Sequence, residues 1–357
     1  MSILWAQFPM TVEKKKMKSR FGTIDVNKKH PITQSEHNHA VTPYMQERML
    51  FAGQQETFDE GVDLIQRFLC VQTNSSQVQR LCRYYGNEPA VEQALIAPAP
   101  VSDEAQAPGD SVLYAGVDGS MLHTDDGYQE VKLGRVFDAK SIEEGGDSRP
   151  RTTIAHSEYI AHLGGHKVFI EKFSQLLQAH VTTATQLVLL SDGATWIRKW
   201  ASKTFPTAIL ILDFFHVLEY LFAFANLALK DESQRKGWCE QQRLLLLQSG
   251  PGQVIANILE LPCKAKAAKD AQKRVVRYYR KNKERMDYAF YKKQGWYIGS
   301  GMIESAHRTV IQKRLRLSGQ RWNTGAQPIL NLRACFMSKK WGNVIDTICQ
   351  KSCKMAA

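Results

Sequence analysis

Three short apolar runs in the middle of the chain, at residues 112–117, 187–191 and 208–212, each lead into an aspartate. Apolar runs of this length, bounded by turn residues, predict buried strands. A further strand at 128–137 and a helix at about 156–179 are predicted between the first and second of these runs. This order of strands and helices predicts an α/β fold with a mixed sheet that has parallel members.

The segment from residue 214 to about 291 has helical spacing almost throughout, and no alternating strand pattern interrupts it. We therefore predict an all-helical insertion over residues 217–295. Gly299 and Gly301 then open a further helix that carries Glu304, with Ser300 as its expected N-cap.

The N-terminal region predicts a small helical domain at residues 51–87. Thr57 and Glu60 have the spacing of a capping box, which starts a helix. A short turn and a second helix at about 75–85 follow, so the pair resembles a helix-turn-helix. Arg80 and Arg83 on the second helix are expected to face DNA. Residues 1–50 form a polar segment and residues 88–111 a linker rich in Pro and Ala.

The positive charge is concentrated in one part of the chain. The net charge is +12, yet residues 261–345 contain 20 Lys and Arg against 4 Asp and Glu. A basic block of this size favours a polyanionic partner, and nucleic acid fits best because no membrane signal is present. The alternative is a solvated helical face. The DNA-binding candidates in this block are Lys273, Arg274, Arg277, Arg280, Arg314, Arg316, Arg321 and Trp322.

Targeting and redox signals are weak in this chain. It has no run of 18 apolar residues, and its Lys14–Lys16 run has the wrong position for a signal peptide, so we expect a cytoplasmic protein. The seven cysteines form no C-x-x-C pair, which argues against a disulfide framework or a cysteine-based zinc site.

Two strand-end aspartates and one helical glutamate predict a metal site. Strands that finish at one edge of a sheet bring Asp118 and Asp192 together, and Glu304 would complete the set. Clustered carboxylates repel unless a cation neutralises them. Oxygen ligands suit Mg²⁺ or Mn²⁺, and two such ions are the usual arrangement for phosphodiester chemistry.

Two blocks of sequence carry a resemblance to a known family. The first is Leu190-Ser191-Asp192-Gly193-Ala194-Thr195-Trp196-Ile197 with the later Asp213-Phe214-Phe215-His216, and the second is Gly299-Ser300-Gly301-Met302-Ile303-Glu304-Ser305 with Arg314-Leu315-Arg316-Leu317-Ser318-Gly319-Gln320-Arg321-Trp322. They resemble the bacterial insertion-sequence transposases of the ISKra group, which are DDE transposases with an RNase H-like fold.

The resemblance implies that Asp118, Asp192 and Glu304 are the catalytic, metal-binding triad. It implies that Asp213 and His216 form a motif near the active site. A Cys-rich N-terminal element, which family members often carry, has no counterpart before Cys70.

The expected fold is therefore an RNase H-like sheet flanked by helices, in two parts at 112–216 and 296–345. The insertion separates these parts, the small helical domain precedes them, and a tail at 346–357 follows. The expected function is cleavage and joining of double-stranded DNA at insertion-sequence ends, by a homo-oligomer. Two alternatives stay open: an RNase H-like nuclease without strand transfer, and a catalytically inactive DNA-binding protein derived from a transposase.

Overall fold

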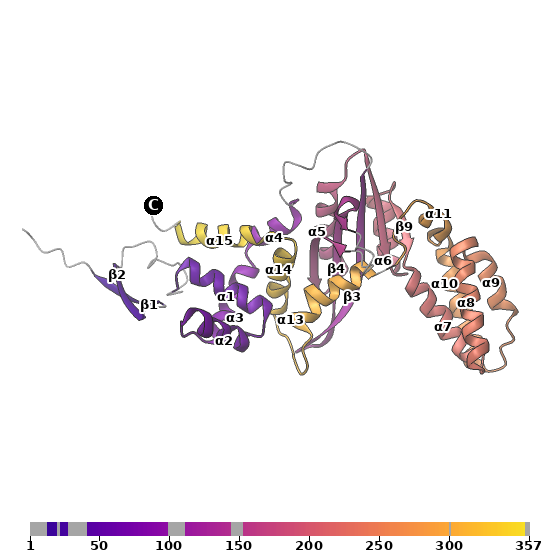
Figure 1. Cartoon of the computed structure of the whole chain (residues 1–357), viewed down its shortest axis with the longest axis horizontal. Helices are drawn as coiled ribbons and strands as arrows, with labels where there is room; N and C mark the ends of the chain where they lie inside the picture. Colours follow the sequence, from indigo (N-terminus) through magenta and orange to yellow (C-terminus); the bar gives the residue numbers. More distant parts are fainter. Residues whose placement is uncertain are drawn as a thin grey trace, which may run out of the picture. The chain divides into compact units, whose positions relative to one another are not determined.

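The computed structural model describes residues 13–19, 22–27, 41–98, 111–143, 153–299 and 301–353. The chain divides into two compact units (Figure 1). The central unit is Ile96–Ile311, and the terminal unit combines Met1–Leu95 with Gln312–Ala357. Ser300, the expected N-cap, lies outside the described residues. No helix among the described residues is long and apolar enough to cross a membrane.

The central unit is built on a mixed five-stranded sheet, which confirms the predicted α/β class. The strand order is β7-β4-β3-β8-β9. Strand β3 pairs in parallel with β8, and β8 with β9, whereas β4 is antiparallel to both β3 and β7. The bounds are β3 Ser111–Thr124, β4 Gly127–Asp138, β7 Glu158–Leu163, β8 Thr185–Ser191 and β9 Ile209–Leu212.

Two helices pack on opposite faces of the β3–β4 hairpin. A Cβ atom on Gly134 would meet Phe173 of α5 (His166–His180), and one on Gly116 would meet Met302 of α12 (Gly301–Ala306). Residues 116 and 118 of a strand share a face because side chains alternate. Asp118 therefore points to the side of the sheet that α12 covers.

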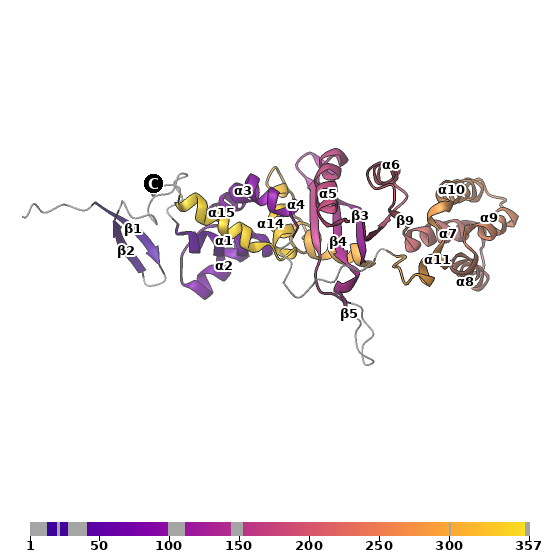
Figure 2. The same ribbon diagram turned by 90° about the horizontal axis from the view of Figure 1, so that it is seen from above.

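Helices follow β9 in a continuous block beside the sheet (Figures 1 and 2). They are α7 Phe214–Ala228, α8 Glu232–Ser249, α9 Pro251–Glu260, α10 Lys266–Asn282 and α11 Tyr288–Lys293. Their apolar faces join the sheet in one core. Two buried tyrosines fasten this core, because Tyr279 Oη donates to Val217 O over 2.9 Å and Tyr288 Oη donates to Leu212 O over 3.0 Å.

Short elements complete the central unit. Helix α6 (Thr195–Thr204) connects β8 to β9, and β5 (Ile142–Glu143) pairs with β6 (Thr153–Ile154). Single 3₁₀ turns occupy Ala139–Ser141 and Lys283–Arg285, and a π-helical segment, His307–Gln312, follows α12.

The terminal unit is mainly helical. It contains the hairpin β1 Lys14–Ser19 with β2 Gly22–Asn27, and the helices α1 Pro43–Gln55, α2 Phe58–Leu69, α3 Ser75–Gly86, α4 Pro89–Ile96, α13 Lys313–Leu315, α14 Ala326–Met337 and α15 Trp341–Cys353. The capping box at the start of α2 is confirmed: Glu60 N donates to Thr57 Oγ1, and Thr57 N donates to Glu60 Oε2.

The division of the chain differs from the predicted one, since α1 begins inside the predicted polar segment 1–50 and α15 occupies most of the predicted tail 346–357. Helix α4 occupies the first part of the predicted linker. Residues 312–345 were expected to complete the sheet domain but instead pack with α1–α3 in the terminal unit. Arg333 Nη1 donates to Gln54 O over 2.7 Å, and Asn331 Nδ2 donates to Gly86 O over 2.8 Å. These buried bonds stabilise the packing of residues 312–345 on α1–α3, because a buried polar group left without a partner would lower the stability of the folded state.

Candidate active site

Three aspartates lie at matching positions along three neighbouring strands of the sheet. Val117 pairs with Ser191, and Ser191 pairs with Leu212. The next residue on each strand is therefore Asp118, Asp192 or Asp213. Strand β3 continues beyond Asp118 to Thr124, so Asp118 lies within a strand, whereas the other two lie where strands end.

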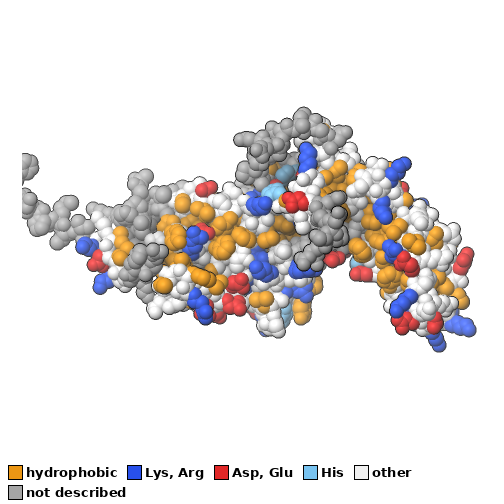
Figure 3. Space-filling model, in the orientation of Figure 1, with side chains coloured by type: hydrophobic (Ala, Val, Ile, Leu, Met, Phe, Trp, Pro, Cys, Tyr) orange, Lys and Arg blue, Asp and Glu red, His pale blue; other side chains and the backbone are white. Residues whose placement is uncertain are grey.

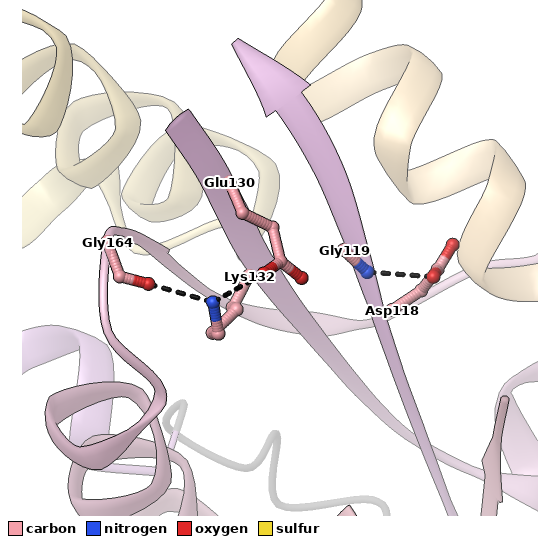
Figure 4. Close-up of polar contacts among 5 residues, drawn as sticks. All are labelled: Asp118, Gly119, Glu130, Lys132 and Gly164. Carbon is pink, nitrogen blue, oxygen red and sulfur yellow. Dashed lines mark hydrogen bonds and ion pairs between the residues drawn. The ribbon is translucent and has the colours of Figure 1, made fainter. Parts of the chain in front are cut away.

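Backbone amides hold each of the three carboxylates. Asp118 Oδ1 accepts from Gly119 N over 2.7 Å (Figure 4), Asp192 Oδ1 accepts from Ala194 N over 2.8 Å, and Asp213 Oδ1 accepts from Phe215 N over 3.1 Å. Asp213 is thereby the N-cap of α7. Local bonds of this kind fix the direction of each side chain before any ligand binds.

The predicted triad lines one cavity of about 150 Å³. Asp118, Asp192 and Glu304 all face it, and Asp213 and His216 of the predicted near-site motif face it too. Val117, Leu190, Ser191, Phe215, Glu219 and Ile303 complete its lining. The sheet edge, the first turn of α7 and helix α12 thus meet at one place, as the sequence predicts.

Arg135 fastens α12, and with it Glu304, to the sheet. This side chain of β4 is buried, and its Nη1 donates to Met302 O over 2.6 Å and to Ser305 Oγ over 2.8 Å. Its Nε donates to Ser157 Oγ over 3.0 Å. Burial lowers the pKa of the Arg135 guanidinium. A charged donor with this many bonds is a rigid attachment, and Glu304 lies between its two contacts on α12.

His307 is a site residue that the sequence analysis missed. It is buried one turn after Glu304, and its Nε2 lies 3.2 Å from Asp118 Oδ2. The two oxygens of Asp118 therefore face two protein groups, the Gly119 amide and this imidazole. The Glu-x-x-His spacing, which puts both side chains on one helical face, is the signal that could have identified it.

The surroundings of Asp192 disfavour its charged form. Burial raises its pKa above the ordinary value for aspartate, and the nearby Asp118 raises it further. The Ala194 amide, His216 and Arg285 act in the opposite direction but less strongly than burial. A buried carboxylate beside a second carboxylate is a position at which a cation is favourable.

His216 is partly exposed at the cavity, so it is not a core histidine. Its Nδ1 lies 3.0 Å from Glu219 Oε2, and its ring contacts Tyr220 and Tyr278. Tyr278 of α10 also lies against the turn after β8, where a Cβ atom on Gly193 would meet its ring. The helical block therefore forms one wall of the site.

The charged residues of the opposite sheet face form a separate cluster. Lys132 Nζ donates to Glu130 Oε2 over 2.9 Å and to Gly164 O over 2.8 Å (Figure 4). Glu130 lies over Gly119, since a Cβ atom there would meet its carboxylate. Gly119 and Asp118 are successive residues of β3, so this cluster belongs to the α5 side and not to the cavity.

The donor set of the cavity fits a hard divalent cation. Asp118, Asp192 and Glu304 supply only carboxylate oxygens, which suit Mg²⁺ or Mn²⁺ better than softer metals. Within the described residues, no three His, Cys, Asp or Glu side chains are close enough in this conformation to form a coordination shell. Because Asp118 faces the Gly119 amide and His307, binding a cation there requires side-chain rearrangement.

The predicted basic face of α10 is exposed. Lys273, Arg274, Arg277 and Arg280 are all accessible, and within the described chain none of the four forms an ion pair. On α8, by contrast, Lys236 pairs with Glu232 and Arg243 pairs with Glu240. Figure 3 likewise shows basic and acidic side chains next to one another on the face of the helical block that it presents. The charge of α10 is therefore less compensated than that of α8.

The DNA-binding candidates of the terminal unit fall into two groups. Arg80, Arg83, Arg316 and Arg321 are exposed, and Arg83 Nη2 donates to Thr324 Oγ1 over 3.0 Å. Arg314 and Trp322 are buried, with 1% and 6% of their surface exposed. Trp322 Nε1 donates to Leu315 O, and the Arg314 guanidinium lies over its ring. Neither side chain is a surface contact in this structure, although both line a pocket of the terminal unit.

Comparison of the chain with protein-family models and with curated protein sequences finds no match. The likeness to ISKra-group transposases therefore depends on the quoted sequence blocks alone. The geometry of the cavity, with carboxylates on adjacent parallel strands and on a helix fixed to the same sheet, is the independent basis for a functional proposal.

Proposed function

We propose that the protein is a metal-dependent DNA transposase of the DDE type, with an RNase H-like central unit that cleaves and joins DNA strands. The observation that carries this proposal is the common cavity of Asp118, Asp192 and Glu304. Two of these residues come from paired parallel strands, and the third comes from a helix bonded to the same sheet.

Each residue of the cavity has a distinct role in this proposal. Asp118 of β3 and Asp192 at the end of β8 would hold divalent cations, and Glu304 would complete the set from α12. Bound cations would activate a water or a 3′-hydroxyl as the nucleophile and stabilise the leaving oxygen. Arg135 keeps Glu304 at the cavity, and His307 lies against Asp118 while no cation is bound. The exposed basic side chains of α10 neutralise phosphates of the bound DNA.

A cleavage assay tests the proposal. The purified protein is incubated with supercoiled plasmid that carries the DNA flanking its own gene, with Mg²⁺, with Mn²⁺ or with chelator. We expect divalent-dependent strand breaks at the element ends in the wild type and none with Glu304→Gln. Breaks that persist in chelator, or in the Glu304 variant, would contradict the assigned chemistry.

Strand transfer separates a transposase from a nuclease with the same cavity. Pre-cleaved element ends with a free 3′-hydroxyl are mixed with a target plasmid and a divalent cation. A transposase joins the ends to the target, whereas a nuclease only shortens them. Binding without either reaction would favour the inactive DNA-binding protein. We expect joined products.

A further inference from the structure

A second pocket lies inside the terminal unit, where two helices begin. It has a volume of about 300 Å³ and is lined by the first turns of α2 and α3 and by residues 320–323, together with Arg314. None of these residues belongs to the cavity of the carboxylates. Its lining contains two arginines, Arg314 and Arg321, and one acidic residue, Asp59.

The start of α3 offers hydrogen-bond donors to this pocket. Asn74 caps the helix by accepting from Gln77 N over 2.9 Å, which is the third amide of the helix. The amides of Ser75 and Ser76 come before it and have no partner within an α-helix. Both serines line the pocket, so their hydroxyl groups add to these donors. The positive end of the helix dipole favours an anion here.

Arg314 is the second and independent feature that points to an anion. Its Nε donates to Gly53 O over 2.9 Å, and its guanidinium lies between the rings of Phe58 and Trp322, at 4.7 and 5.1 Å. Its buried Nη1 has no hydrogen-bond partner among the described residues. Burial lowers the pKa of Arg314 to about 10, so the side chain stays charged at neutral pH. Glu56 and Glu60, which do not line the pocket, raise this pKa but less strongly than burial lowers it. A buried charge attracts an anion more strongly than an exposed one.

We propose that this pocket binds a backbone phosphate of DNA, with Ser75, Ser76 and Arg321 as direct contacts and Arg314 as a buried positive charge that lines it. The proposal rests on the proposed function only for the identity of the ligand as DNA. Arg80 supports this ligand, because it is exposed on the helix that begins at the pocket. A phosphate held here would set the position of α3 on the duplex without selecting sequence.

The test measures the salt dependence of binding to a 30-base-pair duplex of random sequence, with the full-length protein and without divalent cation. Two pocket variants, Ser76→Asp and Arg321→Gln, are compared with Arg67→Gln. Arg67 is exposed in the last turn of α2, at the end of that helix away from the pocket, so this control removes the same charge. Aspartate in a first helical turn is favourable, so Ser76→Asp is expected to fold normally.

We expect each pocket variant to bind the duplex about five- to tenfold more weakly at low salt. The slope of log K against log salt should fall by about 1 in each, the change expected when one phosphate is no longer neutralised. The Arg67 control should keep the wild-type slope. Pocket variants that keep the wild-type slope, or a control whose slope falls as much as theirs, would overturn the proposal.

Two further arms separate the alternatives. Inorganic phosphate is titrated into the protein–duplex complex, and weak, millimolar competition is expected. Competition at micromolar phosphate would assign the pocket to a small anion and overturn the proposal. Cleavage at saturating DNA is measured on the wild type and on Arg67→Gln, and it should be the same in both. If the pocket variants lose affinity and slope as expected but the wild type does not cleave DNA, only the proposed function is refuted. If the wild type cleaves DNA but the pocket variants bind like the wild type, only the pocket proposal is refuted.

Discussion

Asp192 is the residue of the proposed triad at which a bound cation would be most favourable. It lies half-buried at the end of β8, with its pKa raised by burial and by Asp118. A carboxylate kept charged in such a position weakens the folded state unless a cation compensates it. Function and stability therefore have opposite requirements at this residue, and both can be measured.

The first prediction concerns catalysis. Asp192→Asn keeps the shape of the side chain and its bond from Ala194 N but removes a metal ligand. We expect metal-dependent cleavage to fall by at least about 10²-fold, because the variant stabilises the transition state less. Duplex affinity should change less than about twofold. Gel-shift titration and plasmid cleavage on the same preparation provide the check, and substantial cleavage by the variant would remove Asp192 from the triad.

The second prediction concerns stability without metal. The folded-state pKa of Asp192 is raised, so its ionisation penalises the folded state once pH exceeds the ordinary aspartate pKa, about 3.9. Below that value the residue is protonated in both states and costs nothing. Urea unfolding in chelator should therefore show Asp192→Asn gaining stability over wild type as pH rises from about 4 to 7. A difference that is constant with pH would contradict this account of Asp192.

At the scale of elements, Arg135 bonds helix α12, which carries Glu304, to the sheet. Glu304 lies on α12, which continues into the π-helical segment and α13 up to Leu315, and an isolated helix of about this length is only marginally stable in water. Arg135 supplies two of the bonds that hold it, from a strand 167 residues away in sequence. Met302 and Ile303 pack over Gly116 in addition. Glu304 is thus positioned by tertiary contacts and not by helix propensity.

The third prediction tests this contact with a matched control. Arg135→Gln and Lys132→Gln each remove one buried cation with hydrogen bonds from β4, on opposite faces of the sheet. We expect both to cost about 1–3 kcal/mol of stability. Only Arg135→Gln should abolish cleavage at conditions where both variants are folded, and Arg135→Lys should recover part of it. Equal activity in the two glutamine variants would mean that Arg135 has only a structural role.

Local patterns predicted the elements better than the contacts between them. The Thr57–Glu60 capping box and the strand runs before Asp118 and Asp192 appear as expected, because they depend on neighbours in sequence. The burial of Arg314 was not predictable, since its partner Gly53 is 261 residues away. An arginine in a basic block has the same local pattern whether it lies on the surface or inside.

The residues of the site divide in the same way into those that local patterns predicted and those that they did not. Parallel strand ends predicted that Asp118 and Asp192 meet, since the sheet edge follows from strand order. His307 and Arg135 were missed because their roles depend on where α12 packs. The charged residue within the apolar run of β4 was the one signal for Arg135, because buried charges are rare without a specific partner.

At the scale of the whole molecule, the distribution of charge defines where DNA is expected. The uncompensated basic residues of α10 belong to the same unit as the carboxylates, and this helix also provides Tyr278, which lies against Gly193. The helical block therefore combines an exposed basic surface with a wall of the cavity. Binding and chemistry should be separable by mutation.

The fourth prediction tests that separation. Replacing Lys273, Arg274, Arg277 and Arg280 with Gln should lower the salt slope of duplex binding by about 0.9 for each phosphate that the variant no longer neutralises. The control replaces Lys236 and Arg243 of α8, which are already paired with glutamates. It should change the slope little. An unchanged slope in the α10 variant would mean that this face is only solvated.

The most direct measurement of the central claim is anomalous diffraction from crystals of the protein soaked in Mn²⁺. We predict manganese between Asp118 and Asp192, with Glu304 as a further ligand and oxygen distances of roughly 2.0–2.2 Å, close to those of Mg²⁺. Asp118 Oδ2 should then turn away from His307. Manganese bound elsewhere while these three carboxylates keep their present partners would contradict the account.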